Sequence, residues 1–409
     1  MKKPLIIVSS LIVAAALFWA GAFYWRNLRG LGPALKSPPQ DIARLLTPEA
    51  NGADQSPRRV KFPLKLPPGF SIAIFAQGLG NPRVLLQDPG GTLIASIPGQ
   101  GRVVALPDKN QDGIADKVII VARGLQRPHG MIFRREDGKT RLYIAEVEQL
   151  AVYDYDGRNF KASGKKKILD LPGAGRHWTR TMAFLPDGRL LISVGSSCDT
   201  CLEKDWRHAK VLVANPDGSN LKVFASGLRN AVFMALHPLT KQVWVTEMGR
   251  DFLGDNLPPD EINILAEGKD YGWPYCYGNR VHDSQFDPQG TKKAFCKQTV
   301  PAYIDLPAHS APLGLAFFPE TGWPQDYRHN LLVAFHGSWN RSVPTGYKVV
   351  RIKLDDKGNY LGTEDFITGW LTPKGALGRP ADILIKNNGE MYISDDKAGV
   401  VYRVVFTKK

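Results

Sequence analysis

Short apolar runs, each following a polar turn, recur along the chain and determine its predicted architecture. A representative run is Leu-Leu-Ile-Ser-Val at residues 190–194, which follows the turn Pro-Asp-Gly-Arg at residues 186–189. Asp-Gly and Asn-Gly pairs between β-rich runs are strong hairpin signals, because these residues tolerate the positive φ of a tight turn. The repeats lie at residues 88–96, 136–145, 186–194, 238–246, 319–323 and 387–394.

The spacing of these hairpins predicts an all-β fold, a six-bladed β-propeller. The first four hairpins are about 50 residues apart, which is the length of a four-stranded blade. Long helical periodicity is absent, and this argues against a Rossmann or barrel enzyme. We predict that the propeller comprises residues 64–409, an ordinary length for one such domain.

The N-terminal segment, residues 1–25, predicts a membrane anchor helix in front of the propeller. No charged residue follows Lys3 until residue 26, and an apolar run of this length can span a bilayer. A cleaved signal peptide is the alternative, because Ala-Gly-Ala at residues 20–22 resembles a cleavage site. Under either reading we expect a periplasmic body, with the inner membrane as the partner of an uncleaved helix.

Residues 26–63 are rich in proline, glycine and charge, and they predict a linker with a short helix around residues 41–46. The net charge of +14 is spread along the chain and is not concentrated in a tail. No basic, aromatic-studded motif is present, so we do not expect a nucleic-acid partner. A basic surface of this kind suits anionic lipid or an acidic redox partner.

Four cysteines fit an oxidising compartment. The pair Cys198 and Cys201 is compatible with a redox pair, half a zinc site or a local disulfide. A c-type haem would need histidine where Leu202 stands, and no second CxxC or HxxxH completes a zinc site. Cys276 and Cys296 lie in one long insertion. We predict two structural disulfides, 198–201 and 276–296.

Alternating oxygen-bearing side chains predict a structural calcium site in one loop. Asp108, Asn110 and Asp112 precede Gly113, and Asp116 adds a further carboxylate. Such spacing directs side chains towards a hard cation, although the glutamate at the twelfth position of an EF-hand is lacking. The alternative is an Asx-rich turn that bonds its own backbone.

Four groups of polar residues are expected over the central channel of the propeller. They lie at residues 176–180, 227–230, 247–263, and 336–341 together with 378–380. They combine a histidine with several arginines, and this mixture suits a planar, polyanionic ligand. A cation would bridge such a ligand and backbone carbonyls, while the histidine would act as a base on a substrate hydroxyl.

Together these segments resemble the glucose/sorbosone dehydrogenase family, six-bladed propellers that use pyrroloquinoline quinone (PQQ) with Ca²⁺. The match covers about residue 66 to the C-terminus, and its C-terminal part is most similar to the sorbosone dehydrogenase branch. The segments that carry the resemblance are residues 176–195, 227–230, 260–263, 271–274, 336–341, 346–351 and 394–399.

The resemblance implies a role for each matching residue. His177 matches the general base, which takes the proton of a substrate hydroxyl while hydride passes to PQQ. Arg229 and Asn230 match groups that hold the quinone oxygens, where a positive charge also stabilises developing negative charge. Arg341 and Arg379 fall where basic residues clamp the cofactor carboxylates.

The resemblance also implies two metal sites. Gly249 and Arg250 match positions whose backbone carbonyls bind the cofactor calcium. Asp260 and Glu261 match the carboxylates of a second, structural calcium site. Two departures from the soluble glucose enzymes, Arg176 before the base and Val232 after the Arg-Asn pair, argue against glucose as the substrate.

The predicted function is therefore PQQ- and Ca²⁺-dependent oxidation of an aldose or a sugar-derived, sorbosone-like aldehyde. Electrons would pass to an external quinone or cytochrome c. His129, His309 and Trp339 are further candidates for the channel mouth. A calcium-dependent lactonase or hydrolase would need carboxylates and Asn around a central metal, and the arginine-rich pocket disfavours it. A propeller used only as a binding platform is the other alternative.

Overall fold

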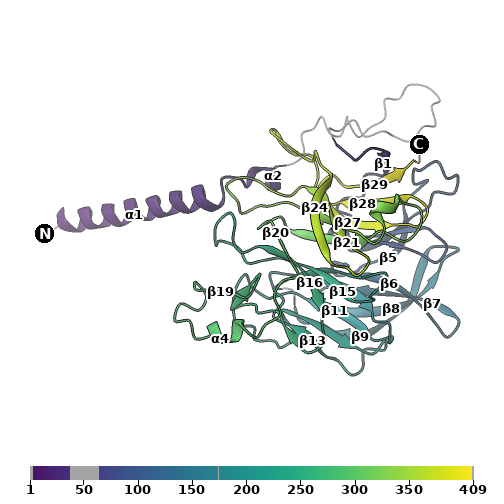
Figure 1. Ribbon diagram of the computed structural model, residues 1–409, viewed down its shortest axis with the longest axis horizontal. Helices are drawn as coiled ribbons and strands as arrows, with labels where there is room; N and C mark the ends of the chain where they lie inside the picture. The colour runs from purple at the N-terminus through teal and green to yellow at the C-terminus, as the bar shows by residue number, and fades with distance from the viewer. Residues whose placement is uncertain (1–2, 37–63, 174, 408–409) are drawn as a thin grey trace.

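Six antiparallel sheets surround one central channel and form the body of the protein (Figure 1). The structure is a computed structural model, and it describes residues 3–36, 64–173 and 175–407. The innermost strands of all six sheets line the channel. This arrangement confirms the predicted all-β, six-bladed propeller.

Each sheet is a four-stranded meander whose first strand is innermost, apart from the closing sheet and one short addition. The first two sheets contain β2 (Leu85–Gln87), β3 (Leu93–Ile97), β4 (Arg102–Leu106) and β5 (Ile119–Arg123), then β6 (Met131–Glu136), β7 (Lys139–Ala145), β8 (Gln149–Asp156) and β9 (Lys161–Asp170). The next two contain β10 (Met182–Phe184), β11 (Leu190–Val194), β12 (Lys210–Ala214) and β13 (Lys222–Ser226), then β14 (Ala231–Leu236), β15 (Val243–Glu247), β16 (Asp260–Leu265) and β20 (Ile304–Leu306). The last two contain β21 (Pro312–Phe317), β22 (Leu331–Phe335), β23 (Lys348–Leu354) and β24 (Tyr360–Ile367), then β27 (Pro380–Ile385), β28 (Glu390–Asp395), β29 (Val400–Phe406) and β1 (Phe70–Ala76).

The predicted hairpins are confirmed in every blade. Each of the six recurring turns joins the first strand of a blade to its second, as in the turn between β10 and β11. There Met182 pairs with Ile192, and every residue of β11 is buried. The apolar runs after the turns are therefore the second strands, which lie between neighbours on both sides.

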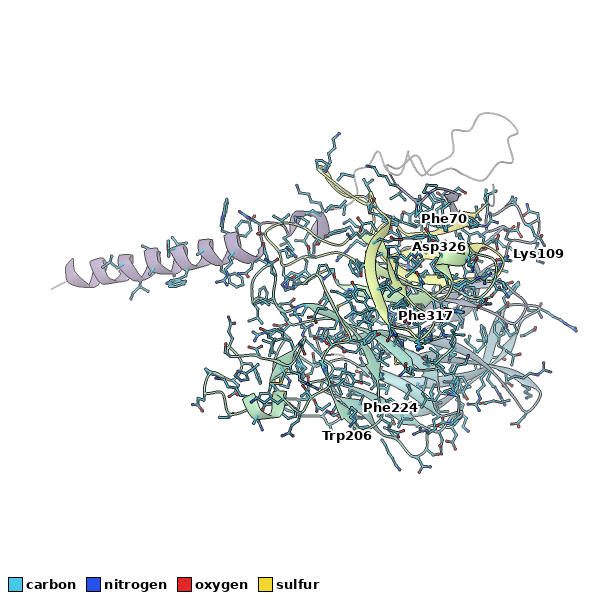
Figure 2. The ribbon with its side chains drawn as sticks, viewed as in Figure 1. Phe70, Lys109, Trp206, Phe224, Phe317 and Asp326 are labelled. Atoms are coloured by element: carbon cyan, nitrogen blue, oxygen red, sulfur yellow. A yellow bond between two sulfur atoms is a disulfide. The ribbon has the colours of Figure 1, made fainter. Side chains whose placement is uncertain are left out.

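The ring is closed by pairing the two ends of the described body. Strand β1 pairs antiparallel with β29 and completes the last blade as its outermost strand. Phe70 at the start of β1 packs within 5.3 Å, between ring centroids, of Tyr327, Phe366 and Phe406 (Figure 2). Each aromatic pair of this kind contributes about 0.5–1.5 kcal/mol beyond the area it buries.

Both predicted disulfides are confirmed, Cys198–Cys201 and Cys276–Cys296. The second lies in the long insertion between β16 and β20. The insertion and the remaining connections hold short elements only, namely β17 (Lys269–Asp270), β18 (Cys276–Tyr277), β19 (Val281–His282), α4 (Lys293–Cys296), β25 (Leu371–Thr372), β26 (Gly375–Ala376), and the 3₁₀ turns η1 (Pro98–Gln100) and η2 (Gln325–Tyr327).

The predicted N-terminal helix is present as α1 (Lys3–Asn27), followed by α2 (Gly32–Leu35). A membrane span needs about 20 predominantly apolar residues. In the part of the chain that the structure describes, no helix is long and apolar enough to cross a membrane. The membrane anchor is not confirmed and stays a prediction. Phe23 of α1 packs on Phe252 of the body at 5.3 Å. The short helix predicted around residues 41–46 lies outside the described residues.

Candidate active site

A cavity of about 330 Å³ opens at the end of the channel where the innermost strands begin. Because each of the first five blades starts with its innermost strand, the residues that precede β10, β14 and β21 meet there. Loops that follow β15 and β22 complete the wall. The lining residues are Arg176, His177, Arg229, Asn230, Met248, Gly249, Asp251, Asp260, His309, Ala311, Trp339 and Asn340.

His177 precedes β10, and the segment that follows β11 fixes its ring. Its Nδ1 lies 3.0 Å from the Ser196 carbonyl oxygen and 2.8 Å from the Ser196 hydroxyl. The hydroxyl donates its own proton to the Cys198 carbonyl at 2.7 Å. Both oxygens near Nδ1 therefore act as acceptors, and Nδ1 must carry the proton. In the neutral ring this leaves the lone pair on Nε2.

The surroundings of His177 keep the ring neutral. Burial, the Arg229 guanidinium and Arg176 lower the pKa of His177 well below 6.5, against the opposing effect of the Ser196 carbonyl and Asp199. A neutral imidazole with a free Nε2 lone pair can accept a proton from a hydroxyl. The geometry therefore suits a general base at this position.

Arg229 precedes β14, and its buried guanidinium is held by Asp199. Nε donates to the Asp199 carbonyl at 2.8 Å, and Nη2 donates to Asp199 Oδ1 at 2.6 Å. Nη1 donates to the Met248 carbonyl at 3.2 Å. The guanidinium is thus clamped in one orientation beside His177, and it supplies a fixed positive charge to this side of the cavity.

Asn230, next along the chain, presents its side chain to the cavity. Its backbone N–H donates to Glu247 Oε1 at 2.8 Å, and its Nδ2 contacts the Met248 sulfur at 3.5 Å. Its Oδ1 is buried and has no hydrogen-bond partner in the protein. Burial raises the pKa of Glu247 well above 4.5. This oxygen lies close to Gly195, where an added Cβ would come within 2.8 Å of it.

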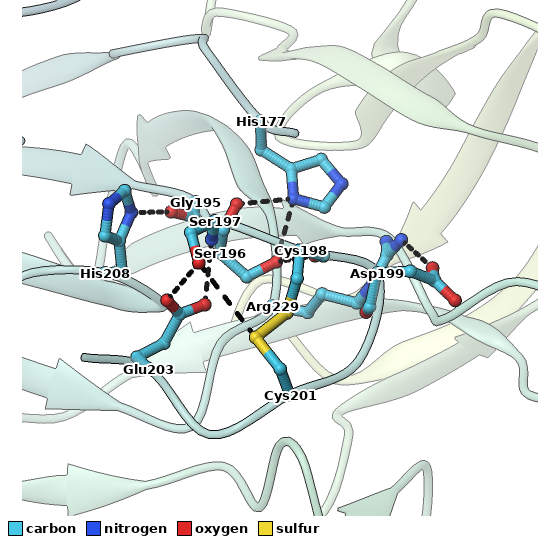
Figure 3. The surroundings of a disulfide bond; sticks show 10 residues. All are labelled: His177, Gly195, Ser196, Ser197, Cys198, Asp199, Cys201, Glu203, His208 and Arg229. Atoms are coloured by element: carbon cyan, nitrogen blue, oxygen red, sulfur yellow. Dashed lines mark hydrogen bonds and ion pairs between the residues drawn. A yellow bond between two sulfur atoms is a disulfide. The ribbon is translucent and has the colours of Figure 1, made fainter. Parts of the chain in front are cut away.

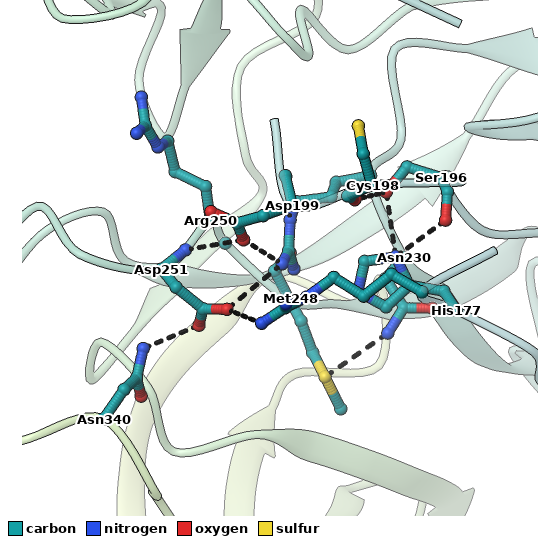
Figure 4. A network of polar contacts seen from close by, with 12 residues as sticks. His177, Ser196, Cys198, Asp199, Asn230, Met248, Arg250, Asp251 and Asn340 are labelled. Carbon is teal, nitrogen blue, oxygen red and sulfur yellow. Dashed lines mark hydrogen bonds and ion pairs between the residues drawn. The ribbon is translucent and has the colours of Figure 1, made fainter. Parts of the chain in front are cut away.

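Asp251 connects the two sides of the cavity (Figure 4). Its carboxylate pairs with Arg176 and accepts a hydrogen bond from Asn340 Nδ2 at 2.6 Å. Its backbone N–H donates to Asp199 Oδ1 at 3.1 Å. Burial raises the pKa of Asp251 to about 6, so this carboxylate remains ionised at neutral pH with its arginine partners.

His309 and Trp339 both line the cavity, as predicted, whereas His129 does not. His309 Nε2 donates to the Gly254 carbonyl at 2.8 Å, and its Nδ1 accepts from Asn340 at 3.2 Å. Both nitrogens of His309 are therefore engaged, in contrast to those of His177. Trp339 forms a flat apolar wall, with the Arg176 guanidinium 5.8 Å from its ring centroid.

The residues predicted to bind calcium divide into two groups. Gly249 and Asp260 line the cavity, and Gly249 N–H donates to Asp260 Oδ1 at 3.0 Å. Burial raises the pKa of Asp260 to about 7. Glu261 instead accepts from Gly278 N–H at 2.6 Å outside the cavity. The Arg250 side chain does not line the cavity, and it pairs with Asp283 at 2.8 Å. The calcium assignments stay predictions.

Arg341 and Arg379 do not reach this cavity. Arg341 donates from Nη1 to the Ala308 carbonyl at 3.1 Å. Arg379 donates from Nε to the His336 carbonyl at 3.0 Å and also bonds the Gly337 carbonyl. Both guanidinium groups are thus engaged with backbone oxygens, and their assignment as cofactor clamps stays a prediction.

The loop at residues 108–116 lies far from the cavity, on the opposite side of the body from α1, where Lys109 marks it (Figure 2). Asp108 accepts from the N–H groups of Asp112 and Gly113, at 3.1 and 3.0 Å. Asp116 accepts from Lys109 N–H at 2.9 Å. These are the bonds of the Asx-rich alternative, and the calcium prediction, which includes Asn110, stays open.

Within the described residues, one group of three His, Cys, Asp or Glu side chains is close enough to share an ion. It consists of Cys198, Cys201 and Glu203. Its two sulfur atoms are joined to each other, so they are not free thiolate ligands.

Ser196 and Asp199, which help to build the site, were missed by the sequence analysis. Asp251 and Asn340 lie in segments that were expected over the channel, residues 247–263 and 336–341, but no role was assigned to them. Asp199 lies inside the CxxC segment, and no local signal marked it or Ser196 as part of the site.

Comparisons with known proteins identify the family and similar folds. The sequence model of the TrAA12-like family matches residues 64–407. An uncharacterised protein of Borreliella burgdorferi is 31% identical over 373 residues, which cover 84% of this chain and 91% of that protein.

A pyrroloquinoline quinone-dependent pyranose dehydrogenase of Coprinopsis cinerea is 25% identical over 407 residues and 84% of this chain. The chain spans about half of that relative, 54% of its length. The solved holo form of the PQQ domain of the Coprinopsis cinerea pyranose dehydrogenase has a TM-score of 0.72 and 22% identity, and covers 86% of this chain and 98% of its own. This likeness shows the fold.

Proposed function

Because the chain belongs to the TrAA12-like family, we propose that it is a dehydrogenase that oxidises a pyranose or another aldose with PQQ as cofactor. One observation carries the proposal: His177 has its Nδ1 held by acceptors, so that Nε2 is free to accept a proton beside a fixed guanidinium. The Coprinopsis relative and the similar solved structure are a PQQ-dependent pyranose dehydrogenase and its PQQ domain, and they suggest the cofactor and the substrate class.

The cavity fits a planar ring that carries carboxylates. Trp339 supplies a flat apolar wall, and the guanidinium groups of Arg176 and Arg229 lie at the same wall, each paired with a carboxylate. The volume of about 330 Å³ is within the range of small-molecule sites.

In the proposed reaction His177 holds the transferred proton. Its Nε2 accepts the proton of the substrate hydroxyl, while the Nδ1–H bond to Ser196 fixes the plane of the ring. Arg229 lies beside this position and stabilises negative charge that develops there. PQQ, when bound, supplies the acceptor for two electrons and the carbon-bound hydrogen of the substrate. The proposed product of an aldose is the corresponding lactone.

A calcium ion would be held by carbonyl oxygens of Gly249 and Arg250 at the cavity wall. Asp260, which lines the same wall, supplies a buried carboxyl group in this region. A cation there would favour ionisation of Asp260, whose pKa burial raises to about 7. Oxidation of sugar-derived aldehydes, including sorbosone-like ones, remains the finer substrate proposal.

We also propose that the electrons leave to an external quinone or cytochrome c and that the body works in an exported, oxidising compartment such as the periplasm. The two disulfides support the compartment, because such bonds persist where thiols are not kept reduced.

The test is reconstitution of the full chain with PQQ and Ca²⁺. Binding is followed by the absorbance of PQQ, and dye reduction is measured with a panel of pyranoses, other aldoses and aldehydes. His177→Gln is the matched variant, because Gln is similar in size and polar but is not a base. PQQ-dependent dye reduction that is lost in this variant is the expected result.

Absence of PQQ binding in the presence of Ca²⁺ would overturn the proposal. Hydrolysis of lactones without PQQ would point to the hydrolase alternative. Binding of PQQ with no oxidation of any substrate in the panel would point to a binding propeller.

A further inference from the structure

We propose that the Cys198–Cys201 disulfide loop is a positioning element of the active site, which orients Arg229 through Asp199 and His177 through Cys198. This inference rests on the proposed function, and it assigns to the loop a role that a structural disulfide does not have. The loop itself does not line the cavity, so it acts through the two side chains that do.

The first contact is between Asp199 and Arg229 (Figure 3). Asp199 accepts two hydrogen bonds from one guanidinium, at its backbone carbonyl from Nε and at Oδ1 from Nη2. The Arg229 side chain is only 4% exposed, so water offers little replacement for these acceptors. A buried charged group that loses its partner bears a large desolvation cost. The position of Arg229 therefore depends on the position of the loop.

The second contact joins the loop to His177 through Ser196. The Cys198 carbonyl accepts the Ser196 hydroxyl proton at 2.7 Å, which turns the hydroxyl oxygen into an acceptor for His177 Nδ1–H. If the Cys198 carbonyl moved away, the Ser196 hydroxyl could rotate and donate to Nδ1. The Ser196 carbonyl, 3.0 Å from Nδ1, would then be the one remaining acceptor for Nδ1–H. The Nε2–H tautomer, in which the ring cannot act as the base in the proposed orientation, would become more accessible.

The disulfide fixes the position of the Cys198 carbonyl relative to the two acceptor groups of Asp199. Only Asp199 and Thr200 lie between the bonded cysteines, so the ring closed by the disulfide is small. The backbone carbonyls of Cys198 and Asp199 belong to this closed segment, and the Asp199 carboxylate is a side chain carried by it. One short closed segment therefore helps to hold the tautomer of the base and directs the guanidinium.

The loop also reaches the opposite wall of the cavity. Asp199 Oδ1 accepts a second hydrogen bond, from Asp251 N–H at 3.1 Å. The Asp251 carboxylate in turn holds Arg176 and Asn340. Displacement of Asp199 is thus expected to loosen Asp251, Arg176 and Asn340, which all line the cavity. This effect adds to the effect of the loop on His177.

The chain provides its own matched control. The second disulfide, Cys276–Cys296, closes a longer segment. In the described part of the chain, the side-chain hydrogen bonds and ion pairs of His177 and Arg229 involve no residue of that segment. The test compares Cys198→Ser/Cys201→Ser with Cys276→Ser/Cys296→Ser in the full chain. Asp199→Ala and Asp199→Asn complete the set, because Asn keeps an oxygen that can accept from Arg229.

Three measurements distinguish positioning from stability. They are the affinity for PQQ by absorbance titration, kcat at saturating PQQ and sugar, and the melting temperature. We expect the Cys198→Ser/Cys201→Ser variant to lose about tenfold or more in kcat and to bind PQQ more weakly, since small misplacements of reacting groups are costly. The control should melt at a lower temperature but keep kcat and PQQ affinity within about twofold of the parent. Asp199→Asn should retain more PQQ affinity than Asp199→Ala.

A fourth measurement needs no cofactor. Imidazole nitrogen NMR, with the His177 signal assigned by its loss in His177→Gln, should show the Nδ1–H tautomer in the parent. It should show a shift towards Nε2–H, or a mixture, in Cys198→Ser/Cys201→Ser. This measurement stands even if the parent fails to bind PQQ, which would defeat the proposed function alone. An unchanged tautomer, or equal losses of kcat in the two disulfide variants, would overturn the positioning role.

Discussion

The substitution Gly195→Ala tests how strongly the proposed reaction depends on the position of His177. Gly195 follows β11 and packs behind both His177 and Asn230. A Cβ added at Gly195 would lie 2.6 Å from His177 Cβ and 2.8 Å from Asn230 Oδ1. Its φ is not positive, so alanine is compatible with the backbone there. The effect of Gly195→Ala would therefore come from displaced neighbours and not from backbone strain.

The size of the displacement follows from ordinary contact distances. Carbon atoms in contact lie about 3.5 Å apart or more, so His177 Cβ must retreat by about 0.9 Å if Gly195 stays in place. Misplacement of a catalytic group by about 1 Å can cost on the order of 100-fold in rate. Overpacking of this kind destabilises a protein by about 1–3 kcal/mol. We therefore expect a large loss of kcat together with a modest loss of stability.

The control for stability is Gly314→Ala in β21. A Cβ added there would lie 2.5 Å from Asp382 Cα, which is at least as crowded, but it would meet no residue that lines the cavity. Dye reduction at saturating PQQ and sugar gives kcat, and thermal unfolding gives the stability of each variant. Gly195→Ala should lose about 100-fold in kcat, and Gly314→Ala should keep most of its rate while melting earlier.

The reasoning would be refuted by one pattern of results. If Gly195→Ala keeps kcat within about twofold while its melting temperature falls like that of the control, the position of His177 does not limit the reaction. The base would then have to be sought among the other titratable groups that line the cavity, which are Asp251, Asp260 and His309.

Three further outcomes are expected. His177→Gln should lower kcat by about 10²–10⁴-fold, the usual contribution of a general base, with PQQ affinity by titration much less affected. His177 should add no inflection to the kcat profile between pH 8 and pH 6.5, because the neutral ring is the active form and the pKa of His177 is lowered well below 6.5; an inflection in this range that disappears in His177→Gln would contradict this. An inflection that persists in the variant is expected from Asp251 or Asp260, whose pKa values burial raises to about 6 and about 7. Burial opposes the ionisation of Glu390, but Lys386 and Arg403 outweigh burial and lower the pKa of Glu390 to about 2. Glu390 therefore stabilises the fold above about pH 4.5, and this contribution is lost as the pH falls towards 2. Glu390→Gln should therefore be less stable than the parent in denaturant at pH 7, and the difference should shrink at pH 3.

The blade hairpins could be predicted because their signal is local. An Asp-Gly or Asn-Gly turn and the apolar run after it determine a hairpin within about ten residues, and every predicted turn lies between the first two strands of a blade. The closing pair β1 and β29 gives no such signal. Its partners, for example Phe70 and Phe406, are separated by almost the whole propeller, and only the closed ring brings them together.

Backbone position is enough to place the short predicted site residues, whereas the long side chain of Arg229 reaches the cavity because Asp199 directs it. His177, Asn230 and Gly249 act close to the backbone, so a correct strand assignment also places them at the cavity. Arg341 and Arg379 have long side chains, and the position of their backbone does not determine where the guanidinium lies. Both guanidinium groups bond to nearby carbonyl oxygens and not to the cavity.

The cavity arginines are paired with carboxylates, and this pairing weakens the inference from arginine content to function. The abundance of arginine in these segments favoured a dehydrogenase over a hydrolase. In the structure Arg229 is committed to Asp199, and Arg176 is paired with Asp251, so neither contributes an unopposed charge. Arginine content alone is therefore a weak discriminator. The orientation of His177, with Nδ1–H held by Ser196 and Nε2 left free, is the stronger argument, because a proton acceptor fixed in this way serves the removal of a hydroxyl proton.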